Sequence, residues 1–155
     1  MRSRFRIIDL VVIGLCILAS LGMLLYYLIA GNDLPAEIPA RFSFTGKISG
    51  YSGRSILLSS PIILLVLTLI LSFVSSFPSA WNLPGVRITE ENLPRISAVI
   101  RTMMDIMLLT VAAVFTAMFI CQARACRMPF FIMPAMLVIF LINVIVGVIR
   151  CHRVA

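Results

Sequence analysis

Four long apolar segments separated by short polar ones make up most of the chain. No charged side chain occurs in the segments 10–31, 55–77, 106–123 and 129–149. A helix needs about 20 apolar residues to cross the hydrocarbon layer of a bilayer, and it pairs its backbone groups within the segment. The pattern therefore predicts an all-α integral membrane protein with four transmembrane helices, forming a single membrane domain over residues 1–155. The helices are expected at about residues 8–30, 55–77, 93–121 and 129–150.

Proline and capping residues refine the ends of these helices. Thr89 and Asn92 can both cap a helix, but a helix capped at Thr89 would contain Pro94 in its interior, where the missing N–H removes a hydrogen bond. Asn92 is therefore the preferred cap of the third helix. Pro61 lies inside the second apolar segment, and we expect a bend there. An inner loop at 78–92 and an outer hairpin at 122–128 complete the connections.

Composition and charge support a location in the membrane. Of the 155 residues, 61% are hydrophobic and 12% are charged, whereas about 25% of the residues in soluble domains are charged. The net charge of +7 alone would suit a nucleic-acid-binding protein, but the Lys and Arg residues lie at the chain ends and between the apolar segments. This placement is typical of membrane interfaces. The expected partner is the lipid bilayer, and nucleic acid is not expected.

Three arginines before the first helix indicate the orientation of the chain. Positive residues favour the cytoplasmic side of a membrane, so Arg2, Arg4 and Arg6 predict a cytoplasmic N-terminus. Four spans return the C-terminus to the same side. The segments 31–54 and 122–128 are consequently expected on the outer face.

Residues 31–54, which we call the cap, contain strand and turn signals. A residue before proline favours extended backbone, as at Leu34 and Ile38, and the alternation around Phe42 is typical of a short strand. Gly46 is expected to take a positive φ at the turn that follows. We therefore predict a compact, hairpin-like cap over the outer ends of the helices.

The cap is expected to have an apolar inner side and a cationic outer side. Apolar residues are unusual in a loop that only connects two helices. Packing on the helix ends is therefore predicted for Leu34, Pro35, Ile38, Pro39 and Phe42. Exposure to a ligand or to lipid headgroups is predicted for Arg41, Lys47 and Arg54. Sealing of the helix ends and binding of a ligand are both open interpretations of this segment.

Three stretches of the chain carry a resemblance to a known family. In order and spacing, "LPAEIPARF", "GKISGYSGR" and "WNLPGVRITEEN" resemble motifs of the bacterial membrane domain of unknown function found in SdpI-type immunity proteins. The resemblance covers about residues 7–120 and implies a place in the bacterial cytoplasmic membrane. The cap positions within these motifs are Leu34, Pro35, Ile38, Pro39, Arg41, Phe42, Gly46, Ser49, Tyr51, Gly53 and Arg54. The inner-loop positions are Asn82, Pro84, Thr89, Glu91 and Asn92.

Two cap positions depart from the family pattern. Arg41 stands where the pattern has His, and Ser49 stands where it has Asp, whereas Arg54 replaces the usual Lys and keeps its charge. If the family His and Asp bind a metal or move a proton, this chain lacks the groups to do so. The chain resembles a short, stand-alone member of the family.

Enzyme activity, metals and cofactors are not expected. His152 is the only histidine, so a nucleophile–base pair, a haem site and a zinc site all lack the residues they need. Cys121 and Cys126 lie at the predicted outer hairpin, where a disulfide and two free thiols are both open.

Few polar groups fall inside the predicted spans. Asp9 and Asp105 lie near the cytoplasmic helix ends, and Asp105 is expected to pair with Arg101 four residues earlier. Asn143 is the one strongly polar residue deep inside a span, and it is expected to form a hydrogen bond with another helix.

Two functions fit this pattern. The first is a non-enzymatic, immunity-like or partner-binding role, in which the cap meets a membrane-active peptide or a protein partner. The alternative is a small transporter or channel formed by a homo-oligomer, with Asn143 lining its pore. The absence of an acid or base near the middle of the bilayer favours the first function.

Overall fold

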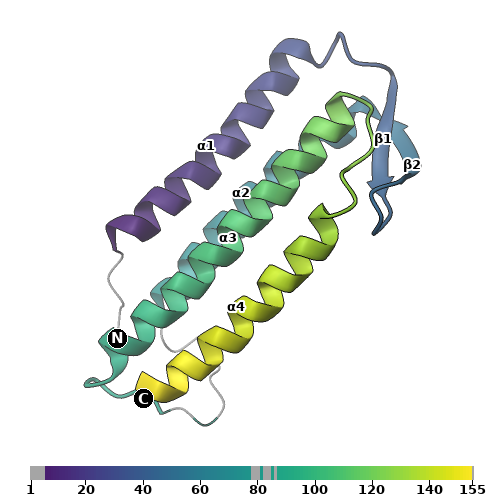
Figure 1. Ribbon diagram of the computed structural model, residues 1–155. Helices are drawn as coiled ribbons and strands as arrows, with labels where there is room; N and C mark the ends of the chain where they lie inside the picture. The colour runs from purple at the N-terminus through teal and green to yellow at the C-terminus, as the bar shows by residue number, and fades with distance from the viewer. Residues whose placement is uncertain (1–5, 78–80, 82–84, 86, 155) are drawn as a thin grey trace.

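The structure is a computed structural model that describes residues 6–77, 81, 85 and 87–154. Its elements are the helix α1 (Ile7–Ala30), the strands β1 (Glu37–Phe42) and β2 (Ile48–Gly53), the 3₁₀ turn η1 (Arg54–Leu58), and the helices α2 (Ser59–Ser76), α3 (Leu93–Ala123) and α4 (Ile132–Val154) (Figure 1). The four helices are long and apolar enough to span a membrane. The predicted fold class is confirmed, and the chain is a multi-pass membrane protein.

Three of the helices form a bundle, and the fourth is added to one side of it. Each of α1, α2 and α3 contacts the other two, whereas α4 packs along α3. Figure 1 shows the small β-sheet at one end of the bundle, with the first turn of α1 and the last turn of α4 at the opposite end. This arrangement agrees with four spans, because the start of α1 and the end of α4 lie at the same end of the bundle.

A buried amide fixes α4 on α3. The side-chain Nδ2 of Asn143 donates to the backbone oxygen of Met103 at 2.9 Å, which confirms the predicted bond to another helix. One helical turn later, Gly147 lets the Met103 side chain approach so closely that a Cβ atom would collide with it. The side-chain nitrogen of Asn143 therefore has a partner within one copy of the chain.

The start of α3 agrees with the prediction, and the start of α2 does not. Asn92 directly precedes α3 as predicted, and Pro94 lies in the first turn. The Asn92 side chain makes no capping bond to an N–H of the helix, however, because its oxygen accepts from the N–H of Thr89. In α2 the expected bend at Pro61 is replaced by η1, which ends where the α-helix begins at Ser59. Pro61 thus falls in the first turn of α2, where its missing N–H removes no intrahelical bond. The cap leads directly into η1, and the change from 3₁₀ to α-helix lies at the start of the span.

Several hydroxyl groups inside the helices donate to carbonyl oxygens of the same helix, whereas the buried Ser60 hydroxyl in the first turn of α2 does not. Ser20 donates to the oxygen of Cys16 at 3.0 Å, and Thr68 donates to that of Leu64 at 2.7 Å. Such bonds remove the cost of placing an unpaired hydroxyl away from water. The same device allows serines in α2 near the end opposite the cap, where Ser72 donates to the oxygen of Thr68 at 2.6 Å.

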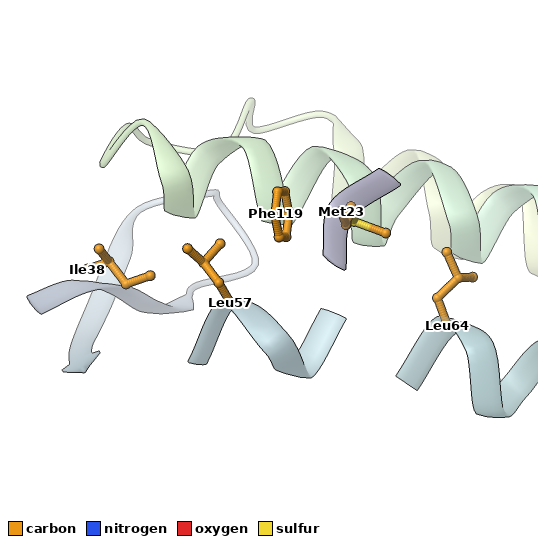
Figure 2. Close-up of a cluster of buried hydrophobic side chains, with 5 residues drawn as sticks. All are labelled: Met23, Ile38, Leu57, Leu64 and Phe119. Atoms are coloured by element: carbon orange, nitrogen blue, oxygen red, sulfur yellow. The ribbon is translucent and has the colours of Figure 1, made fainter. Parts of the chain in front are cut away.

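The cap folds as the predicted hairpin. Strands β1 and β2 pair antiparallel, with irregular register between Pro39 and Phe42. Ile38 and Leu57 are fully buried and belong to one cluster with Met23 and Phe119 from the helices (Figure 2). This cluster attaches the sheet to the helix ends by apolar burial.

The predicted packing of the apolar cap residues on the helix ends is correct except at Pro35. Ile38 and Pro39 are buried, Leu34 packs against the apolar cluster, and Phe42 is half-buried. Pro35 is exposed, because it lies before β1 begins and does not share the face that the strand turns towards the helices.

Gly46 joins the cap to the loop between α3 and α4. Its φ is +77°, as predicted, and its N–H donates to the oxygen of Ser43 at 2.8 Å. Its own carbonyl accepts a hydrogen bond from the N–H of Met128 at 3.1 Å. A Cβ atom at Gly46 would collide with the Met128 carbonyl. Both the turn and the docking therefore require glycine.

The four cysteines all lie in the described part of the chain, and all are free thiols. Cys121 is buried in the last turn of α3, and its thiol donates to the oxygen of Arg127 at 3.7 Å. Cys126 is exposed in the following loop. The N–H of Cys126 donates to the backbone oxygen of Cys121 at 2.9 Å, so the two residues are neighbours, and a disulfide between them stays a prediction.

The exposed thiol offers a test of orientation. A membrane-impermeant maleimide added to intact cells is expected to label Cys126, because this side chain is exposed near the cap, while Cys16, Cys121 and Cys151 are buried. The variant Cys126→Ser should abolish the signal. Labelling that requires permeabilised cells would place the cap in the cytoplasm and reverse the predicted orientation.

Candidate functional sites: a buried charge cluster and the cap

Four charged side chains meet between α1 and α3 at the end of the bundle opposite the cap. They are Arg6, Asp9, Arg101 and Asp105, which we call the charge cluster. The side chains of Asp9 and Arg101 are each 2% exposed. Two positive and two negative groups balance, so the cluster has no net formal charge.

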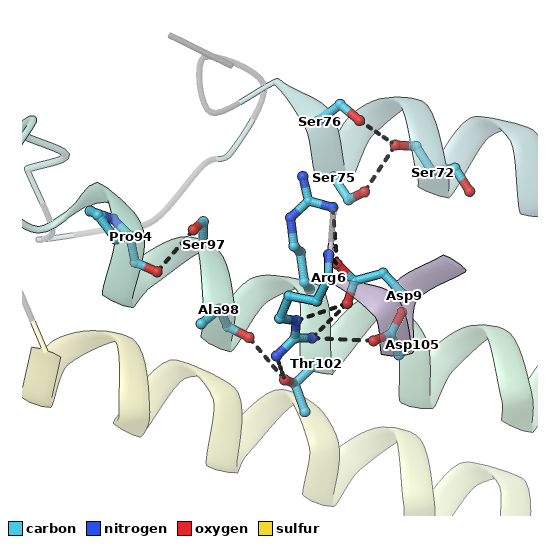
Figure 3. A network of polar contacts seen from close by, with 11 residues as sticks. Arg6, Asp9, Ser72, Ser75, Ser76, Pro94, Ser97, Ala98, Thr102 and Asp105 are labelled. Carbon is cyan, nitrogen blue, oxygen red and sulfur yellow. Dashed lines mark hydrogen bonds and ion pairs between the residues drawn. The ribbon is translucent and has the colours of Figure 1, made fainter. Parts of the chain in front are cut away.

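Arg6 binds both helices from its place just before α1. Its Nε donates to Asp9 at 2.9 Å, and its terminal nitrogens lie 3.3 Å from Asp105 and 3.1 Å from the hydroxyl of Thr102. Figure 3 shows the Arg6 side chain between Asp9 of α1 and the pair Thr102 and Asp105 of α3. The Arg6 backbone N–H also donates to Asp9 at 2.7 Å, which caps the first turn of α1. Arg6 thus stabilises the first turn of α1 and also attaches this turn to α3.

Arg101 forms the second cross-link between the two helices. Its guanidinium nitrogen donates to an Asp9 oxygen at 3.2 Å. The spacing of Arg101 and Asp105 along α3 predicts a pair within that helix, whereas the structure shows two pairs that join different segments, from Arg101 to Asp9 and from Arg6 to Asp105. A buried charge needs such compensation, because its desolvation is costly.

Helix α2 closes the cluster on its third side. A cavity of about 10 Å³, enough for about one water molecule, lies among Asp9, Arg101 and Asp105 and the serines Ser72 and Ser75 of α2. No three His, Cys, Asp or Glu side chains gather as metal ligands in the part of the chain that the structure describes. This arrangement can hold three helices together and shelter one water.

The cap is the second candidate site, and its outward face combines aromatic and cationic side chains. Phe44 in the turn is 59% exposed and Tyr51 on β2 is 63% exposed. Arg41 and Lys47 are also exposed, as predicted. This face does not contribute to the apolar cluster that holds the cap on the helices.

Arg54 has a different role from the one predicted for it. Its side chain is half-buried, and one guanidinium nitrogen donates to the oxygens of Gly31 and Asn32 at 3.3 and 3.1 Å. These carbonyls follow the end of α1, where they have no intrahelical partner. Arg54 therefore ties the start of α2 to the end of α1 and does not face a ligand.

The remaining motif positions do not complete a site at the cap. Ser49 and Gly53 are exposed on β2. Thr89 and Asn92 bond reciprocally before α3, since the Thr89 N–H donates to the Asn92 side chain at 2.8 Å and the Asn92 N–H donates to the Thr89 hydroxyl at 3.3 Å. Glu91 is exposed beside them, while Asn82 and Pro84 lie outside the described residues. The inner-loop motif builds the start of α3, at the end of the bundle away from the cap.

Comparisons with known proteins add no family assignment. The chain matches no family model, no curated protein and no solved structure. A functional interpretation therefore depends on the geometry of the two sites and on the motifs themselves.

Proposed function

We propose that this multi-pass membrane protein is a non-enzymatic binding protein that receives a membrane-active peptide or a protein partner on its cap. The observation that carries the proposal is the division of the cap into two faces. One face is locked on the helix ends through Ile38 and Leu57, and the other presents Arg41, Phe44 and Tyr51 to the surroundings. Exposed aromatic and arginine side chains are enriched at surfaces that bind protein partners.

The proposed role is immunity-like, and its place is the bacterial cytoplasmic membrane. The resemblance of the motifs to those of SdpI-type immunity proteins supports both statements. On the orientation predicted by the N-terminal arginines, both chain ends are cytoplasmic and the cap meets molecules that arrive from outside. Arg41, which replaces the family His, is a permanent cation and suits a partner that presents carboxylates.

A transporter or channel receives less support from the described residues. Asn143, the residue that would line an oligomeric pore, is 7% exposed and donates its amide to Met103 of the same chain. The charge cluster is balanced, and the cavity beside it has a volume of only about 10 Å³. Neither feature provides a path for an ion.

Removing two cap charges tests the binding role. The double variant Arg41→Gln/Lys47→Gln is expected to leave the melting temperature in detergent unchanged, because both side chains are exposed. It should weaken binding of a peptide about tenfold or more, which is the effect of losing charge-assisted contacts. Weaker binding is measured as lower survival of a deletion strain that expresses the variant during challenge with membrane-active peptides.

Arg54 provides the matched control. Arg54→Gln removes one cationic side chain from the same region, but it is expected to lower the melting temperature because it frees the carbonyls at the end of α1. A double variant that is stable and fully protective would end the proposal and leave the cap as a seal over the helix ends.

A further inference from the structure

A groove of about 390 Å³ runs between α1 and α3 near the cap and ends beside Arg124. We propose that this groove binds an acyl chain of an acidic phospholipid, with the lipid phosphate bound by Arg124. The inference concerns the membrane lipid and does not depend on the ligand of the cap.

Small residues line the bottom of the groove and leave room there for an acyl chain. Ala19 and Gly22 line the groove from α1, and Ala123 lines it from α3. A Cβ atom built on Gly22 would meet no atom within 4 Å, so the space beside this residue is unfilled by the protein. The lining residues of α1 extend over about 10 Å along the helix axis. An extended hydrocarbon chain fits such a channel.

Aromatic rings form a wall close to the cap end. Tyr26 of α1 and Phe119 of α3 both line the groove and meet edge to face, with their centroids 5.7 Å apart. The Tyr26 side chain is 43% exposed. Tyrosine is enriched where hydrocarbon gives way to headgroups, so the position of Tyr26 places the mouth of the groove at the level of the lipid phosphate.

Charge identifies the headgroup. Arg124 follows the last residue of α3 and is exposed. All the ion pairs among the described residues lie in the charge cluster at the other end, so Arg124 has no carboxylate partner. The segments at the cap end have an excess of positive charge, with the cations Arg41, Lys47, Arg54, Arg124 and Arg127 and the acids Asp33 and Glu37. An arginine at a cationic surface binds phosphate through two parallel N–H donors.

A second groove on the same protein has no counterpart of Arg124 and serves as a comparison. The groove between α3 and α4 has a similar volume, about 410 Å³, and it also contains small residues, Ala113 and Ala117. No charged side chain lines it. It can accommodate hydrocarbon, but it offers no group that distinguishes one lipid headgroup from another.

The test uses the purified full chain in detergent with added phosphatidylglycerol or phosphatidylcholine of identical acyl chains. Native mass spectrometry should detect retained phosphatidylglycerol, and the melting temperature should rise more with this lipid than with phosphatidylcholine. Glycerol phosphate, which has the anionic group without the chains, should have no effect on the melting temperature. A rise as large as that with phosphatidylglycerol would identify an anion site and overturn the lipid proposal.

Two variants locate the site, and a third controls for the substitution. Gly22→Leu should fill the bottom of the groove and abolish retention of the lipid, whereas Gly14→Leu makes the same change on α1 at a glycine that is also open but does not line the groove. Arg124→Gln should weaken binding of phosphatidylglycerol about tenfold and remove the preference over phosphatidylcholine. The proposal is wrong if Gly22→Leu retains as much phosphatidylglycerol as Gly14→Leu, or if Arg124→Gln keeps the full preference. Since leucine favours helix more than glycine, folding of Gly22→Leu is expected to be maintained.

Discussion

Asp9→Asn is expected to lower the free energy of unfolding by about 3–5 kcal/mol, the range for breaking a buried ion pair by removing one partner. The substitution takes away the carboxylate to which the buried Arg101 guanidinium donates, and it weakens three contacts of Arg6 at the start of α1. Unfolding by a denaturing detergent, followed by circular dichroism, measures the effect. Asp33→Asn removes an exposed carboxylate near the end of the same helix and should change the free energy by less than about 0.5 kcal/mol.

A second substitution in the charge cluster tests the physical reason. Removing Asp9 and Arg101 together, as Asp9→Asn/Arg101→Met, leaves the pair of Arg6 and Asp105 and keeps the cluster neutral. The double variant is therefore expected to be more stable than the sum of the two single effects predicts. Strictly additive effects, or an Asp9→Asn variant as stable as Asp33→Asn, would show that the cluster does not hold α1 on α3.

Gly46→Val is expected to cost about 3 kcal/mol or more and to detach the cap from the loop between α3 and α4. A β-branched residue at φ +77° is strained by about 1–3 kcal/mol, and its Cβ atom would also collide with the Met128 carbonyl. Thermal unfolding in detergent gives the loss of stability. Alkylation of Cys121, a buried thiol bonded to the oxygen of Arg127 in the same loop, should become faster as the cap detaches.

Gly53→Val is the matched control for this change. Gly53 ends β2 with a negative φ, and the nearest atom to a Cβ atom there is the Ala36 oxygen at 4.0 Å. The same increase in side-chain size should therefore be tolerated at this position. If Gly46→Val and Gly53→Val lowered the stability equally, valine would be unfavourable throughout the cap. The specific docking of Gly46 at Met128 would then be refuted.

The two effects should be independent, because the charge cluster and Gly46 lie at opposite ends of the bundle. Free energies of distant sites usually add within about 0.5 kcal/mol. The combined variant Asp9→Asn/Gly46→Val is thus expected to lose the sum of the two single effects. A loss of free energy smaller than this sum would indicate that the cap and the start of α1 unfold as one cooperative unit.

Features that depend on neighbouring residues could be predicted from the amino-acid sequence. The length of the apolar segments identified the four spans. The position of Pro94 selected Asn92 as the start of α3, and the turn after Phe42 required a positive φ at Gly46. The isolation of Asn143 in an apolar span required a partner on another helix, although it did not indicate which one.

Contacts between residues that are distant in the sequence could not be predicted, because they depend on the folded chain. Arg6 is 99 residues from Asp105, and Asp9 is 92 residues from Arg101, so helical spacing could predict only a pair within α3. The sequence predicts Arg54 as a surface cation, whereas in the fold its guanidinium donates to the carbonyls at the end of α1. The groove beside Arg124 exists because small residues of α1 and α3 face each other. Periodicity specifies which face of a helix is apolar or polar, but the partner of that face depends on how helices cross in space, and that is a property of the folded chain.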